Sequence, residues 1–146
     1  MAKKFKLDAV LNYRTTLEEQ AQQALAMSLQ KQGDLQAAID QQQKELQEQD
    51  QQLKLRQQEG LTIAEIDLYE GHIGHCRRRW AELNVELQRL EQKILKQRES
   101  LLQAARDRQV LDKLKERQEA EFRQEQERKE RTQLDEISLR NKRNVT

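Results

Sequence analysis

Three side chains of types that bind metal ions lie close together in the sequence, namely His72, His75 and Cys76. Residues three apart on a helix share a face, so the two histidines could offer two ligands to one ion. A tetrahedral site needs four ligands, and the chain has no further histidine or cysteine that could complete one. We therefore predict that the chain holds no metal and no other cofactor, and that the histidines flank a buried thiol.

Other arrangements that could carry chemistry are equally sparse. No glycine-rich phosphate loop is present, and no Ser/His/Asp or paired-carboxylate arrangement can be placed in a pocket. The densest basic run, Arg77 to Arg79, fans over more than half of a helix circumference and forms no stripe that could follow a phosphate backbone. A net charge of +1 gives no field that would steer the chain to nucleic acid. These observations predict a protein that is not an enzyme and does not bind nucleic acid.

The composition favours long, solvated helices over a thick hydrophobic core. Charged residues make up 36% of the 146 residues and aromatic residues 3%, and proline is absent. Such a composition at helical period is typical of coiled coils. No run approaches the roughly 20 apolar residues that span a bilayer, no signal peptide is indicated, and the single Cys76 cannot form an internal disulfide. We expect a soluble cytoplasmic protein that does not insert into a membrane.

A seven-residue repeat runs through the second half of the chain. Its first position, a, holds Ile66, Ile73, Trp80, Leu87, Ile94 and Leu101. Its second position, d, holds Tyr69, Cys76, Leu83, Leu90, Gln97, Ala104 and Leu111. An a/d stripe makes helices pack side by side over long distances. A long apolar seam on an otherwise charged helix therefore requires a partner helix.

The strongest break in the helical pattern lies between Gln57 and Leu61. Gly60 can adopt the left-handed conformation that closes a helix, and Thr62 starts a capping box with Glu65. Since a short connection favours antiparallel helices, the predicted fold is all-α, a long two-helix antiparallel coiled-coil hairpin with an overhanging charged C-terminal helix or tail. We divide the chain into a basic lead-in (1–7), a first helix (8–57), a turn (58–62), a second helix paired with the first (63–112) and a charged C-terminal extension (113–146).

The turn also predicts which residues face each other. If it is centred between Glu59 and Gly60, apolar residues face each other in four pairs, Leu53–Ile66, Leu46–Ile73, Ile39–Trp80 and Leu25–Ile94. Cys76 then faces the first helix near Gln43, and the hairpin alone is a monomer. The extension has no seam within the chain, so we expect a frayed tail in the isolated protein, with a helix that binds something else as the alternative.

Three segments carry features beyond the heptads. They are the opening Phe5-Lys6-Leu7-Asp8-Ala9-Val10-Leu11 with Tyr13-Arg14 and Glu18-Glu19, the turn Gly60-Leu61-Thr62 with Tyr69, and the tail Leu134-Asp135-Glu136-Ile137 with Arg140. Together they resemble the flagellar export protein FliJ family, over nearly the whole chain. The resemblance implies a two-helix antiparallel coiled coil similar to the stalk subunit of rotary ATPases. It also implies a component of the flagellar type III export apparatus, peripheral to the cytoplasmic face of the cell membrane, with a role in flagellum assembly and motility.

The resemblance further implies three partners. Family members are thought to enter the ring of the hexameric export ATPase and promote its assembly, to contact the transmembrane export gate, and to cycle unloaded export chaperones. In the family, a face formed by both helices near the hairpin tip engages the gate. The matching residues in this chain are Ala38, Gln42, Glu45, Gln49, His72, Cys76, Arg79 and Leu83.

A different class of protein stays open on the heptads alone. The chain could be a structural coiled-coil scaffold or tether, for example a parallel dimer, unrelated to export. Cys76 distinguishes the two, because in a parallel in-register dimer it lies beside its twin and oxidises readily to a disulfide. In a monomeric hairpin it faces the first helix and resists cross-linking.

Overall fold

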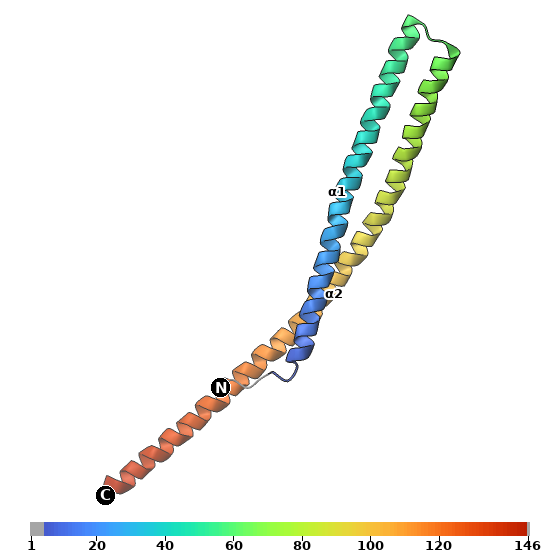
Figure 1. The fold of residues 1–146 in the computed structure, drawn as a ribbon. Helices are drawn as coiled ribbons and strands as arrows, with labels where there is room; N and C mark the ends of the chain where they lie inside the picture. Colours follow the sequence, from blue (N-terminus) through green and yellow to red (C-terminus); the bar gives the residue numbers. More distant parts are fainter. Residues whose placement is uncertain (1–4, 146) are drawn as a thin grey trace. The chain divides into compact units, whose positions relative to one another are not determined.

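The structure, a computed structural model, describes residues 5–145 and consists of two helices (Figure 1). Helix α1 spans Asp8–Glu59 and helix α2 spans Ile63–Val145, and no strand occurs among the described residues. The predicted all-α helical hairpin is thus confirmed. Of the expected lead-in, Lys3 and Lys4 lie outside the described residues.

The charged extension is helical in the structure, where the sequence favoured a frayed tail. Helix α2 runs without interruption to Val145, and every residue from 123 to 144 is exposed. Neither glycine nor proline occurs after Gly74, so nothing in this stretch breaks the helix. Pairs one turn apart, such as Lys129 and Glu125 with 4.0 Å between the amine and carboxylate, add small stabilisation to an exposed helix.

The chain divides into two compact units. The loop unit comprises Ala21–Ser100, and the terminal unit combines Met1–Gln20 with Leu101–Thr146. In the loop unit, Arg56 contacts Tyr69 and Glu45 contacts Cys76, so positions later in α1 meet positions earlier in α2. The same inverse order holds in the terminal unit, where Asp8 pairs with Lys115 and Glu18 with Arg108. The two helices are therefore antiparallel within each unit.

The loop between the helices has the capping geometry that the sequence predicts. Gly60 has a φ of 97°, the left-handed conformation that glycine adopts without steric penalty and that closes a helix. The hydroxyl oxygen of Thr62 accepts a hydrogen bond of 3.2 Å from the backbone N–H of Glu65, and the Thr62 carbonyl accepts one of 3.1 Å from Ile66. Thr62 is thus the N-cap of α2.

The register of the hairpin differs from the prediction. Because α1 extends to Glu59, the loop is centred on Leu61 instead of between Glu59 and Gly60, and this change moves the facing residue on α2 by three positions. Ile39 accordingly belongs to a buried cluster with Leu83, whereas Trp80 is 38% exposed. A tryptophan at this a position is too large for the narrow seam, so it lies at its edge.

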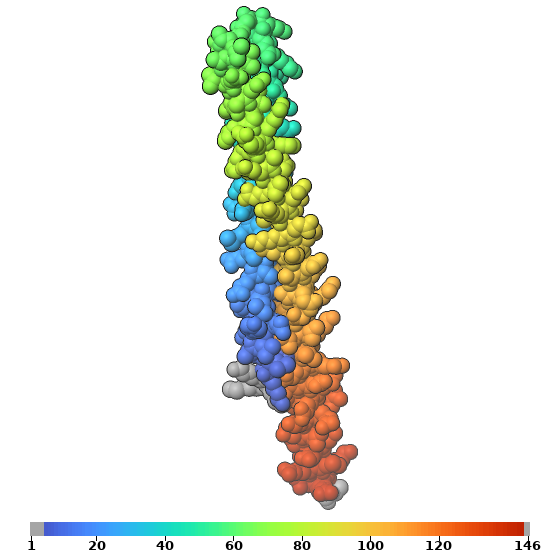
Figure 2. Space-filling model, turned by 90° about the vertical axis from the view of Figure 1, so that its right-hand side faces the viewer, coloured from blue at the N-terminus to red at the C-terminus, as the bar shows by residue number. Residues whose placement is uncertain are grey.

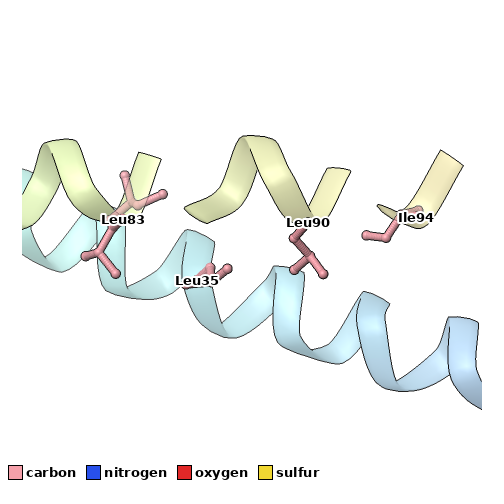
Figure 3. Packing of buried hydrophobic residues seen from close by; sticks show 5 residues of the cluster. Leu35, Leu83, Leu90 and Ile94 are labelled. Atoms are coloured by element: carbon pink, nitrogen blue, oxygen red, sulfur yellow. The ribbon is translucent and has the colours of Figure 1, made fainter. Parts of the chain in front are cut away.

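The hydrophobic core lies in the loop unit. Its central cluster consists of Leu35, Ile39, Leu83, Leu90 and Ile94, all less than 9% exposed. In Figure 3, Leu83, Leu90 and Ile94 project from α2 toward α1, where Leu35 lies between the first two. The space-filling view shows yellow α2 side chains in contact with blue α1 side chains along this unit (Figure 2). These apolar contacts hold the two helices of the loop unit together.

In the terminal unit, ion pairs occupy seam positions alongside apolar residues such as Leu11, which is 8% exposed. The heptad continues on α2 with Arg108 and Lys115 at a positions, and both pair with acidic residues of α1. Arg108 contacts Glu18, and the Lys115 amine lies 3.3 Å from the Asp8 carboxylate. The hydrogen bonds that Arg108 donates to Glu18 and Asp112 raise the pKa of its guanidinium, so the group stays cationic wherever the protein is folded.

Contacts of the terminal unit also reach beyond Asp112, where the sequence led us to expect the paired region to end. Phe5 precedes α1 and is only 8% exposed. It shares a groove with Leu114 and Phe122 of α2. The segment before the first helix therefore lies beside apolar side chains of the extension, for which we expected no partner within the chain.

The buried cluster leads to a stability prediction. We expect Leu83→Ala to lower the free energy of unfolding by about 2–5 kcal/mol, because it removes a side chain that is 3% exposed and leaves a cavity. Leu95→Ala, at a residue that is 57% exposed, is the matched control and should change it by less than about 0.5 kcal/mol. Urea unfolding followed by circular dichroism measures both, and equal effects would contradict the assigned seam.

The ion pairs lead to a prediction about salt. Between low and high sodium chloride, amide hydrogen exchange in residues 8–20 should accelerate roughly threefold to tenfold, because salt screens the partly exposed ion pairs. Amides of residues 35–39, beside the apolar cluster, should not accelerate. In the Lys115→Met variant, salt should accelerate amide exchange in residues 8–20 by a smaller factor, because the ion pair between Lys115 and Asp8 is absent. An equal response in both segments would show that ion pairs do not hold the terminal unit.

Candidate partner-binding face

The eight residues predicted to bind a partner fall on one side of the loop unit. Relative to the a positions, four of them occupy g and four occupy d. The g residues are Ala38, Glu45, His72 and Arg79, and the d residues are Gln42, Gln49, Cys76 and Leu83. In an antiparallel pair of helices, the g positions of both helices flank the same side of the seam. We call this set the candidate face.

Side-chain contacts join three residues of the candidate face across the two helices. The Cys76 sulfur lies 3.7 Å from the His72 Nε2 atom and 4.0 Å from a carboxylate oxygen of Glu45. Cys76 is 2% exposed and lies within the seam between the helices. Glu45 is half-buried. The structure thus places Cys76 opposite Glu45, two residues from the predicted Gln43, because the turn is displaced.

Two residues of the candidate face are buried in the seam. Cys76 and Leu83 are 2% and 3% exposed and pack between the helices. A direct contact with another protein is therefore restricted to the other six, of which His72 and Arg79 are exposed and four are half-buried. The half-buried residues are Ala38, Gln42, Glu45 and Gln49. The predicted assignment of these residues to a partner stays a prediction.

Gln42, a residue of the candidate face, is a weak point of the seam. Its side-chain carbonyl oxygen is buried and has no hydrogen-bond donor in the structure. An unpaired buried acceptor costs about 1–3 kcal/mol, so this position makes the hairpin less stable than an apolar residue would. A polar residue in a coiled-coil seam also disfavours alternative registers, which gives Gln42 a specifying role.

The metal-binding residue types do not assemble a site among the described residues. No group of three or more His, Cys, Asp or Glu side chains there is arranged to hold a metal ion. His72 contacts Cys76, while His75 is exposed on the surface of α2. The absence of metals and cofactors stays a prediction.

Comparison with known proteins identifies the family. Residues 3–145 match the family described as flagellar FliJ protein, which is nearly the whole chain. The chain belongs to the FliJ family. It is accordingly a component of the flagellar export apparatus, with a role in flagellum biogenesis and protein export. No curated protein and no solved structure matches it. Within residues 5–145, neither helix contains a stretch apolar enough to cross a membrane.

One contact near the loop of this FliJ-family chain was not foreseen. Arg56 of α1 donates a hydrogen bond of 3.3 Å to the hydroxyl oxygen of Tyr69 on α2. This bond raises the pKa of the Arg56 guanidinium. Tyr69 was visible as a seam residue, but Arg56 had no distinguishing pattern. Both residues occupy d positions, on opposite helices. The contact between them could therefore be predicted only once the register of the two helices was known.

The burial of Cys76 makes the hairpin distinguishable from a parallel dimer in solution. We expect the native Cys76 thiol to react with a disulfide reagent at least roughly 100-fold more slowly than the urea-unfolded protein, because the helices must separate first. A Cys76→Ser/Ser100→Cys variant, whose thiol replaces an exposed hydroxyl, should react at the unfolded rate. Rapid formation of a Cys76 disulfide dimer would contradict the monomeric hairpin.

Proposed function

We propose that this FliJ-family protein acts without enzymatic activity, as a coiled-coil stalk that engages the export ATPase ring, the transmembrane export gate and the export chaperones. It would work at the cytoplasmic face of the cell membrane, where the gate lies. Membership of the FliJ family, over residues 3–145, is the observation that carries the proposal. The antiparallel hairpin supports it, because a narrow pair of helices can enter a ring and present its sides to several subunits.

The surface chemistry is compatible with contacts that exchange. The chain has 27 basic and 26 acidic residues, and the ion pairs of Arg79 with Glu82 at 3.7 Å and of Lys129 with Glu125 at 4.0 Å are exposed. An exposed ion pair contributes only about 0–1 kcal/mol. Contacts made by such residues would be weak one by one, so rebinding or rotation inside a ring would not be trapped in one orientation.

The test of the ATPase contact uses purified proteins. We expect the full chain to raise both ATP hydrolysis and hexamer formation by the export ATPase of the same host. Hydrolysis is followed by phosphate release and assembly by analytical ultracentrifugation. No effect on either quantity would contradict the stalk role. In the host, deletion of the gene should abolish or strongly reduce motility and filament export.

The candidate face leads to a separate prediction about the gate. We expect Glu45→Lys combined with Arg79→Glu to weaken binding to the cytoplasmic domain of the gate roughly tenfold, because two charges on the face are reversed. Glu48→Lys combined with Arg78→Glu reverses the same charges at exposed positions off the face and is the matched control. Calorimetric titration measures the affinity, and circular dichroism checks that both variants fold. Equal losses would place the gate contact elsewhere.

A further inference from the structure

A groove runs along the loop unit between α1 and α2, farther from the loop than the candidate face. It has a volume of about 460 Å³. Its residues are Ala24, Met27, Ser28 and Lys31 of α1 with Glu86, Arg89, Leu90, Lys93 and Gln97 of α2. The hollow follows from the small side chains of Ala24 and Ser28, which lie one turn apart opposite larger residues. We call it the basic groove.

The basic groove combines an apolar floor with a positively charged rim. Leu90 is buried in its floor, and Met27 is 71% exposed beside it. Lys31, Arg89 and Lys93 supply three cations, against the single carboxylate of Glu86. None of the three cations forms an ion pair with another described residue. Their charges are therefore available to a partner.

A polar atom at the groove has no partner in the structure. The side-chain carbonyl oxygen of Gln97 is buried and receives no hydrogen bond. Gln97 lines the groove, and rotation about its side-chain bonds would turn the amide toward anything that lies there. After that rotation, a bound chain that carried an amide donor at this point would satisfy the acceptor.

The backbone of the hairpin decides what form the ligand takes. All backbone groups along the groove are engaged within α1 and α2, so an extended peptide would find no backbone partners and would leave its own groups unpaired. A helix satisfies its own backbone and can lie along the groove between two helices, as in a three-helix bundle. The α2 residues from Glu86 to Gln97 span about 18 Å, enough for three turns of such a helix.

From these observations we infer that the basic groove binds an amphipathic α-helix of another protein, with a narrow apolar stripe, acidic residues beside it and an amide side chain that pairs with Gln97. The buried Leu90 and the exposed Met27 beside it offer apolar contacts, which favour a helix over a nucleic-acid backbone that would match the cations alone. This inference holds independently of the proposed contact between the candidate face and the gate.

The first experiment titrates the isotope-labelled full chain with designed helical peptides of about 20 residues. One peptide carries a leucine and alanine stripe with flanking glutamates and a central glutamine. The second has lysine at every glutamate position. We expect the glutamate peptide to shift backbone resonances of residues 24–31 and 86–97, and to bind at least roughly fivefold more tightly than the lysine peptide.

The second experiment reverses the charge of the groove. Arg89→Glu combined with Lys93→Glu should invert the preference, so that the lysine peptide binds more tightly. Lys44→Glu combined with Lys54→Glu makes the same change at exposed positions outside the groove and should leave the preference unchanged. Several outcomes would overturn the inference. They are no preference between peptides, shifts spread over both units, binding of duplex DNA at the same residues, or concentration-dependent shifts without peptide, which would indicate a second copy. No export component is used, so these outcomes do not bear on the stalk role.

Discussion

A seam between only two helices can bury each apolar side chain from one direction, and this constraint governs the whole structure. Nine apolar residues are buried among the described residues, and seven of them lie in the loop unit. Other seam residues, such as Leu25, Leu46 and Leu87, remain half-exposed although they occupy a or d positions. Within residues 5–145 no third layer covers them. Stability therefore depends on a short row of residues, and the sides of the seam remain open to other proteins.

Polar residues interrupt that row at three seam positions. Ser28, Gln42 and Gln97 all occupy d positions, and the two glutamines carry buried oxygens without donors. Apolar residues there would make a tighter hairpin. Polar ones instead penalise slipped registers, which a purely apolar heptad would tolerate. They also leave an unsatisfied acceptor at Gln42 in the candidate face, and a hollow with a second unsatisfied acceptor at the basic groove. The same residues thus weaken the seam and shape the surfaces proposed to receive partners.

Local sequence signals predicted the two helices and the turn well. The contacts between the helices depended on one further quantity, the register in which α1 faces α2. Gly60 and Thr62 marked the ends of both helices because capping requires particular residue types. The register was displaced by three positions because α1 continues to Glu59, and a hairpin transmits such an error to every facing pair. The heptad pattern could not reveal this displacement, because apolar residues face each other in several different registers. The contacts between Ile39 and Leu83 and between Glu45 and Cys76 could only come from the structure.

The candidate face was predicted from family resemblance, and periodicity alone could not divide it into exposed and buried members. A d position such as Cys76 and a g position such as His72 both lie beside the partner helix, and the size of the facing side chains decides which one is covered.

Periodicity alone was also insufficient to predict the contacts of the terminal unit. There the seam continues with Arg108 and Lys115, residues that read as surface charges until acidic partners on α1 are in place. Because charged contacts weaken in salt while apolar contacts do not, the share of helix pairing that these ion pairs supply in the terminal unit is sensitive to salt. A cationic partner that competed with Lys115 for Asp8, or with Arg108 for Glu18, would weaken the ion pairs between the helices of the terminal unit. The apolar cluster of the loop unit contains no charged residue and would stay in place.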